Sequence, residues 1–294
     1  MPAWRAFGTI AALVAAVLVA IVLHDRVFPR PLLHPANDFT TFYCSGEVVR
    51  QHADPYLVEP LRSCEQRRGE FSPSADAPWE VMPSPFPGYV LAIYALMSLL
   101  PYGAAHLAWL AVLLSGVGAT IVFLRRLTGF AWLPLLAIAG VLLGFWNIDT
   151  SELTPVVSAL LAYAALCARA GAWPRAGVFV ALAMLIPHLT LPAFVALLLF
   201  APAARPALLF TTAGLAALSV VTLGVGPNIE YFTRTLSTHA RAEVWFPYQY
   251  SLTHLLARLG AAPDLAILAG EISYFVLIAL GVWAGHRLRS VGGD

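Results

Sequence analysis

The sequence contains no lysine, and all seventeen of its basic residues are arginine. Catalysis through a lysine Schiff base is therefore excluded. Charge of either sign is scarce, because Asp, Glu, Lys and Arg make up 11% of the 294 residues, whereas a soluble domain has about 25%. The net charge is +1 and no basic patch rich in aromatic residues occurs, so we expect no nucleic-acid partner.

Several catalytic motifs are missing as well. The sequence has no Cys or His cluster with zinc-ligand spacing, no glycine-rich phosphate loop and no Gly-x-Ser-x-Gly elbow, so ATP-driven and serine-hydrolase mechanisms lack their usual residues. Cysteine is also rare. Cys44 and Cys64 fall in one polar region, where an oxidising location would permit a disulfide, but their spacing leaves the pairing open. Cys167 is expected to be an apolar filler.

Apolar residues are abundant instead. They form 60% of the chain, and the mean hydropathy is +0.76, which is too high for one globular core. A membrane-spanning helix needs about 20 mostly apolar residues. The clear candidates are Phe7–Leu23, Ala104–Leu124, Phe130–Trp146, Leu153–Ala168, Ala207–Gly224 and Leu265–Gly285. No small-residue cleavage site follows the first of these, so we expect an uncleaved helix rather than a signal peptide.

Two further apolar segments are ambiguous. Phe86–Leu100 is short and follows a proline cluster, so it is either a full helix or a re-entrant element. Ala176–Pro202 is too long for one span, and Pro187-His188 interrupts it. We expect two short helices that turn near Pro187.

The arginines predict the topology, because positive residues in short loops stay on the cytoplasmic side. Taking Phe86–Leu100 as re-entrant places the following on that side: Arg5, Arg125, Arg126, Arg169, Arg175, Arg205, Arg287 and Arg289. The expected fold is thus an all-α polytopic membrane protein, a single domain over residues 1–294 with about eight spans. Residues 25–83 and 226–264 are the first and last outer loops, and Asn147–Glu152 and Pro187-His188 also face outward. In the alternative topology Phe86–Leu100 crosses fully.

The first outer loop holds the leading candidate for chemistry. Asp38 precedes Phe39, Phe42 and Tyr43, which recur at helical spacing, so Asp38–Val49 is predicted to be an amphipathic interfacial helix. A carboxylate close to lipid is costly and is a functional candidate by default. Asp38 is either the cap of this helix or a catalytic base, and Tyr43 is a candidate substrate contact beside it.

Short motifs along the chain resemble those of glycosyltransferase family 87, whose members are membrane transferases with the GT-C fold. The matching pieces are Asp38–Tyr43, the Ala53-Asp54-Pro55-Tyr56 turn, Pro83–Pro87, Ser151-Glu152-Leu153-Thr154, Ala176–Pro187 and Gln249-Tyr250-Ser251-Leu252. The chain departs from the family pattern at three positions. Ile186 stands where Lys is frequent, Glu152 where Gln is usual, and Ala53 where the turn has Gly.

The resemblance implies the function. A hexose or pentose, mannose- or arabinose-like, would pass from a polyprenyl-phosphate donor to a glycolipid or glycan acceptor on the outer face, with Asp38 as the general base. A carboxylate can take the proton of an attacking sugar hydroxyl, and one base suffices because lipid phosphate is a good leaving group. No cofactor is expected. The arginine-only, Ala- and Leu-rich composition, typical of GC-rich coding, suggests a bacterial cytoplasmic (inner) membrane.

Other residues are candidate substrate contacts. His188, at the start of a helix after Pro187, is a candidate for the phosphate, and Arg234 and Arg241 are further phosphate candidates. Asp149 and Glu152 are candidates for acceptor hydroxyls or, with Asp38, for a divalent metal. Three other features carry alternative interpretations. The aromatic run Trp245–Tyr250 would either stack on sugar rings or form an interfacial belt. Glu271 lies inside an apolar run, where it would line a cavity or pair with an Arg. Arg50, Arg62, Arg67 and Arg68 are expected to be solvated or bound to lipid headgroups.

Two rival functions remain open at the level of sequence. A helix broken in mid-chain is also a feature of transporters, although no internal repeat is evident. The missing Lys next to Pro187 also fits a non-catalytic, glycolipid-binding relative.

Overall fold

The computed structural model describes residues 37–68, 84–140, 143, 146–244 and 251–291. Within them every regular element is helical, as predicted. The helices of the first half are α2 (Asn37–Arg50), α3 (Val58–Arg67), α4 (Gly88–Met97), α5 (Tyr102–Thr128), α6 (Trp132–Ala139), α7 (Trp146–Asp149) and α8 (Thr154–Arg169). The others are α9 (Trp173–Ala183), α10 (Pro187–Phe200), η2 (Pro202–Ala204), α11 (Arg205–Leu223), α12 (Val225–Glu230), η3 (Tyr231–Thr235), α13 (Leu236–Glu243), α14 (Leu252–Arg258) and α15 (Pro263–Val291).

Three of these helical segments are long and apolar enough to cross a membrane: Tyr102–Thr128, Pro202–Leu223 and Pro263–Trp283. The chain is therefore a membrane protein. Helices α4, α8 and α10 are apolar but shorter. The predicted first span, Phe7–Leu23, lies outside the described residues, and the number of eight spans stays a prediction.

The predicted break near Pro187 is present. Ile186 is extended between α9 and α10 (φ −124°, ψ 91°). Phe179 of α9 packs in one cluster with Phe194 and Leu197 of α10, and Gly177 at the start of α9 lies against Ala204, which follows α10. These contacts show that the two helices form an antiparallel hairpin. Proline at the first position of α10 fixes the start of the second helix.

Arginines gather at one end of the helix bundle. Arg169 of α8 donates to the carbonyls of Arg126 and Leu127 at the end of α5. Arg205 donates to the carbonyls of Leu198 and Leu199 at the end of α10, over 2.6 and 2.9 Å. We predicted that these arginines lie on one side of the membrane. In the structure they connect the ends of α5, α8 and α10 and the start of α11 at one end of the bundle.

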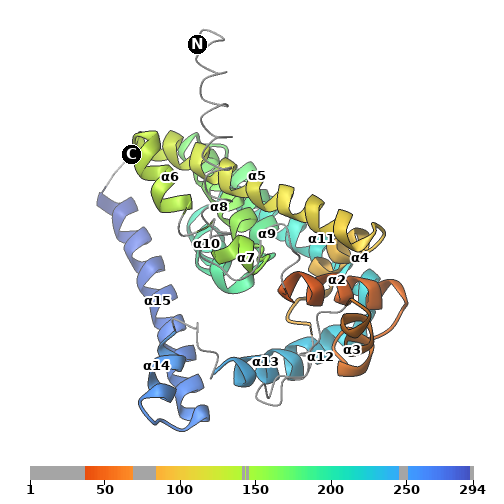
Figure 1. The fold of residues 1–294 in the computed structure, drawn as a ribbon. Helices are drawn as coiled ribbons and strands as arrows, with labels where there is room; N and C mark the ends of the chain where they lie inside the picture. The colour runs from red at the N-terminus through yellow and green to blue at the C-terminus, as the bar shows by residue number, and fades with distance from the viewer. Residues whose placement is uncertain (1–36, 69–83, 141–142, 144–145, 245–250, 292–294) are drawn as a thin grey trace, which may run out of the picture.

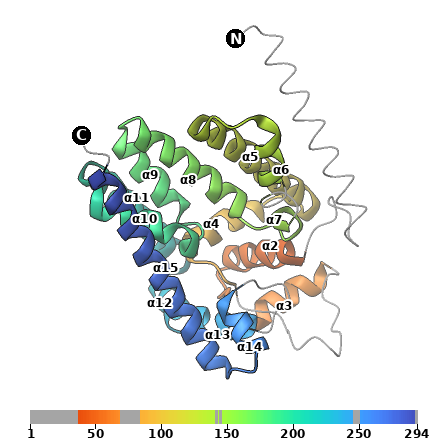
Figure 2. The same cartoon turned by 90° about the vertical axis from the view of Figure 1, so that its left-hand side faces the viewer.

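The other end of the bundle holds α2, α3 and α4 together with α12, α13 and α14, and α15 runs alongside the bundle (Figures 1 and 2). Helix α4 has ten residues, about 15 Å at 1.5 Å per residue. Its first residue, Gly88, lies against Ser219 near the end of α11. Leu100, just past its last turn, accepts a hydrogen bond from Tyr43 of α2.

Helix α2 differs from the prediction in its surroundings. The interfacial helix was expected to be half exposed, but nearly all its side chains between Phe39 and Val49 are buried. Helix α3, which the sequence did not predict, covers its second face: Leu61 packs on Cys44 and Val48. The bounds of the helix, Asn37–Arg50, agree with the predicted range Asp38–Val49 to within one residue at each end.

Candidate active site

Asp38 lies in the first turn of α2, and it is the exposed residue at the start of an otherwise buried helix. A carboxylate is favourable there because the N-terminus of a helix carries partial positive charge. Asp38 also forms contacts of its own within the protein. Its place in the first turn and its exposure to solvent are compatible with both roles considered for it.

Aromatic contacts fix the start of α2 against the start of α5. The ring of Phe39 lies 5.7 Å from that of Tyr102 and 5.1 Å from that of His106, measured between centroids. The hydroxyls of Thr40 and Tyr102 are hydrogen-bonded at 2.5 Å. Because Phe39 and Thr40 follow Asp38 directly, these contacts hold the Asp38 backbone beside the first turn of α5.

The turn before α8 presents Glu152 on the same side of the molecule. The indole of Trp109 in α5 donates to the Ser151 carbonyl at 3.0 Å, and Ser151 has a φ of 58°, a conformation that glycine adopts more readily. Glu152 is exposed, with its carboxylate near the Thr154 hydroxyl at 3.4 Å. It also interacts electrostatically with the Tyr94 hydroxyl, which is buried and has no hydrogen-bond partner among the described residues.

One hydrophobic cluster underlies three of the predicted site residues. It contains Phe39, Leu153 and Ile186, together with residues of α4 and α5. Asp38 precedes Phe39, Glu152 precedes Leu153, and His188 follows Ile186 by two positions. The structure therefore brings Asp38, Glu152 and His188 to the margin of a single core, although they are far apart in sequence.

The structure describes the surroundings of His188 and Asp149 in less detail. His188 is exposed in the first turn of α10, and its carbonyl accepts a hydrogen bond from Tyr274 of α15 at 2.7 Å. Asp149 ends α7, in the same turn as Glu152, but its side chain lies outside the described part of the chain. The aromatic segment Trp245–Tyr250 does so as well.

Arg234 and Arg241 lie away from this core. Arg234 is in η3 and forms an ion pair with Glu230, and Arg241 is in α13 and pairs with Asp264 of α15 at 3.1 Å. Both guanidinium groups therefore already have an acidic partner. Their positive charge is largely neutralised in this structure.

Tyr43, a candidate substrate contact, has a buried side chain with partners inside the protein. Its side chain is 3% exposed, its hydroxyl donates to the Leu100 carbonyl at 2.9 Å, and its ring packs edge-on against Tyr102. The structure accounts for this residue as a link between α2 and the segment that leads into α5.

Sequence analysis missed a cluster that holds α2 in place. A disulfide joins Cys44 of α2 to Cys64 of α3, which settles the pairing left open above. The buried carboxylate of Glu47 accepts hydrogen bonds from Arg67 at 2.9 Å and from Arg68 at 2.8 Å. The Glu47 and Arg67/Arg68 positions are about 20 residues apart, so no local pattern signals the pair.

The same cluster corrects the expectation for one arginine. Arg68 was expected to be solvated or bound to lipid headgroups, but it is partly buried and ion-paired with Glu47, and its guanidinium also lies 5.0 Å from the Tyr43 ring centroid. Arg67 pairs with Glu47 as well, but it is exposed to solvent, as expected. Burial acts to raise the pKa of Glu47. Hydrogen bonds and charge from Arg68 and Arg67 outweigh burial, and the pKa of Glu47 lies below its usual value. The carboxylate is therefore ionised near neutral pH.

The described residues contain no group of three or more His, Cys, Asp or Glu side chains arranged to hold a metal ion.

The fold and this site define a class: an all-helical membrane protein with titratable side chains gathered at one end of its bundle. The sequence profile of glycosyltransferase family 87 matches residues 85–293, and since this is most of the chain, the protein belongs to that family and is a membrane glycosyltransferase by descent. Asp38 lies before the matched range. No curated protein and no solved structure matches the chain.

Proposed function

We propose that the protein transfers a mannose- or arabinose-like sugar from a polyprenyl-phosphate donor to a glycolipid or glycan acceptor, with Asp38 as the general base. The membership in glycosyltransferase family 87 supports the reaction class. The observation that carries the site is the common core beneath Asp38, Glu152 and His188. An outer-face reaction at a bacterial cytoplasmic membrane is part of the proposal.

The reaction needs one base. An acceptor hydroxyl oxygen attacks the anomeric carbon while the bond from that carbon to the phosphate oxygen breaks. Asp38 takes the hydroxyl proton, and the bond electrons leave with the polyprenyl phosphate. The configuration at the anomeric carbon inverts in this single displacement. The exposed Asp38 carboxylate in the first turn of α2 is accessible for such a proton transfer.

His188 is the favoured contact for the leaving phosphate. It lies in the first turn of α10, a helix of 14 residues, whose backbone N–H groups and positive end favour an anion. Arg234 and Arg241 are weaker phosphate candidates, because Glu230 and Asp264 already neutralise them. Glu152, and Asp149 in the same turn, are the proposed contacts for acceptor hydroxyls.

The helix lengths support a proposed membrane arrangement. A 10-residue α4 reaches about half of a 30 Å hydrocarbon layer, and both of its ends neighbour elements at the α2 end of the molecule. We therefore propose α4 as the re-entrant element, with eight spans in all and the Asp38 end outside.

The test is Asp38→Asn in the full chain, reconstituted in lipid nanodiscs and supplied with labelled polyprenyl-phosphate mannose or arabinose. Loss of a general base lowers the rate by about 10²–10⁴-fold, and we expect kcat to fall by this amount with an unchanged thermal midpoint. Asp54→Asn is the matched control. The Asp54 carboxylate accepts from the Tyr56 backbone at 2.8 Å, and asparagine can form the same turn.

The outcomes separate the rival functions. Turnover that survives Asp38→Asn shows that Asp38 is not the base. Binding of the sugar lipids by the wild-type protein without any turnover supports a glycolipid-binding relative, and movement of the sugar lipid across a vesicle membrane supports a transporter.

A further inference from the structure

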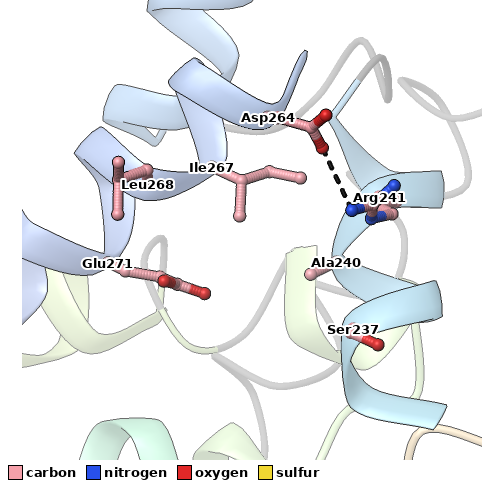
Figure 3. A pocket seen from close by; sticks show the side chains of 7 residues that line it. All are labelled: Ser237, Ala240, Arg241, Asp264, Ile267, Leu268 and Glu271. Atoms are coloured by element: carbon pink, nitrogen blue, oxygen red, sulfur yellow. Dashed lines mark ion pairs between the residues drawn. The ribbon is translucent and has the colours of Figure 1, made fainter. Parts of the chain in front are cut away.

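A cavity of about 280 Å³ lies between α13 and α15, away from the core beneath Asp38. Figure 3 shows the Glu271 side chain extending from α15 toward α13, while Arg241 and Asp264 bridge the two helices. The cavity is lined by Ser237, Ala240, Arg241, Asp264, Ile267, Leu268 and Glu271. None of these residues contributes to the cluster that contains Phe39.

Glu271 is the unusual member of this lining. It lies eight positions after Pro263, the first residue of α15, and so about 12 Å along the helix, within a segment apolar enough to span a membrane. Glu271 is exposed at the protein surface, where the cavity is open, and its carboxylate has neither a hydrogen bond nor an ion pair with any described residue. An acid within a membrane-spanning segment is costly unless a protein group, water or a ligand satisfies it.

The charges of the cavity select against anions. Arg241 and Asp264 neutralise each other, so Glu271 leaves the lining with a net charge of about −1. A phosphate group would meet an unpaired carboxylate and no free cation. Hydroxyl groups suit this lining, because the carboxylate of Glu271 accepts hydrogen bonds, and so does the hydroxyl of Ser237, whose own proton is donated to the Arg234 carbonyl at 2.9 Å.

The remaining wall of the cavity is apolar. Ala240, Ile267 and Leu268 line it, and such side chains suit the C–H face of a sugar ring, while polar groups opposite bind its hydroxyls. The volume of 280 Å³ is near the lower limit of about 300 Å³ for ligand pockets, which fits one ring rather than a chain of rings.

We propose that this cavity is a binding subsite for a neutral, hydroxyl-rich ring of the acceptor, held chiefly by Glu271 and Ser237. The identification of the ligand as acceptor rests on the proposed glycosyltransferase function, whereas binding of a hydroxylated ring does not. In this proposal Arg241 is not a phosphate contact. Its ion pair with Asp264 instead fixes the side chains at the opening of the subsite.

Binding is tested with the full chain in lipid nanodiscs by saturation-transfer NMR, with methyl α-mannopyranoside as the neutral probe and inorganic phosphate as the anionic one. We expect the mannoside to bind and phosphate not to compete. Glu271→Gln replaces a charged hydrogen-bond acceptor of the protein by a neutral amide, and it should weaken mannoside binding about tenfold. The matched control is Glu59→Gln, because Glu59 is exposed and lies on α3.

Leu268→Trp gives a second test, because it fills the cavity and leaves the carboxylate in place. It should abolish mannoside binding while the thermal midpoint stays within the range of the controls. Mannoside binding that is equal in the wild type, Glu271→Gln and Leu268→Trp overturns the proposal, as does displacement of the mannoside by phosphate.

Transfer assays separate this proposal from the proposed function. A functional enzyme whose KM for the acceptor is unchanged by Glu271→Gln refutes the subsite and leaves the function intact. Mannoside binding that depends on Glu271, in a protein without any transfer activity, refutes the function and leaves the ring-binding site. Asp38→Asn should retain mannoside binding.

Discussion

At residue scale, Glu47 shows how much the position of α2 depends on one carboxylate. It is 8% exposed and accepts hydrogen bonds from Arg67, Arg68 and Gln51. Removing one partner of a buried charge pair is costly because the other charge stays buried. Arg67 is half exposed, which screens part of this energy.

We therefore expect Glu47→Gln to lower the free energy of unfolding by about 2 kcal/mol. The pKa of Glu47 is lowered in the folded protein, so its stabilising effect is fully present above the unfolded value, about 4.3, and is lost as the pH falls through the folded value. Thermal unfolding of both proteins from pH 7 to pH 3 measures this. The midpoints should converge at low pH, and a constant difference contradicts the assignment.

How much of the candidate site could be predicted depends on how local its signals are. The place of Asp38 at the start of a helix could be predicted because an acid next to helically spaced aromatics is a local pattern, and the start of α10 because proline marks it. Arg68 was misread because its partners, Glu47 and the Tyr43 ring, come from another helix. The disulfide needed the Cys44 and Cys64 backbones to be placed 5.6 Å apart.

At the scale of elements, the packing of α2 on α4 depends on Gly46. A Cβ atom at this position would lie 2.1 Å from the Tyr94 carbonyl oxygen, so the two helix backbones are in direct contact. Small residues permit such close approach between helices in membranes. The contact sets the depth at which the whole of α2, including Asp38, lies against the bundle.

Gly46→Ala should consequently destabilise the protein by about 3 kcal/mol, the upper part of the range for overpacking, and reduce transfer activity by displacing α2. Gly118→Ala in α5 is the matched control, since a Cβ there meets nothing within 4 Å, and it should be neutral or slightly stabilising. Thermal unfolding and transfer rates of the two variants provide the comparison. Equal midpoints would show that the α2–α4 contact is looser than described.

Element prediction succeeded where apolar runs and prolines mark the helices. The α9–α10 hairpin follows from Pro187, and α5, α8 and α11 contain most of the apolar runs Ala104–Leu124, Leu153–Ala168 and Ala207–Gly224. It failed for α3, whose ten residues have few apolar positions and become ordered through the disulfide and Glu47. For the same reason α2 was taken as interfacial, because its covering helix was not foreseen.

At the scale of the whole molecule, the arginines of the short loops gather at one end of the bundle. Arg125, Arg126, Arg169 and Arg205 lie there, whereas Asp38 and Glu152 lie at the other end, which also carries the ion-paired Arg67, Arg68 and Arg241. The rule that short-loop arginines are cytoplasmic predicts an orientation for this bundle. The family match extends from residue 85 to residue 293 and so includes both ends of the bundle.

The orientation can be measured in intact cells with a membrane-impermeant thiol reagent. In a Cys167→Ala background we expect Thr238→Cys to be labelled and Arg175→Cys to be protected until the membrane is opened. Both positions are exposed in the structure, so accessibility within the protein does not limit the comparison. Labelling at position 175 in intact cells, with protection at 238, would invert the proposed topology.

The arginine contacts at the bundle end give the missing lysine a structural meaning. Arg169 and Arg205 each hold two successive carbonyl oxygens, which have no amide partner at the last turn of a helix. A planar guanidinium can span two such oxygens at once, whereas an ammonium is a single point of charge. At these two positions, exchange for lysine would preserve the positive charge and leave one carbonyl oxygen at the end of a helix without a donor.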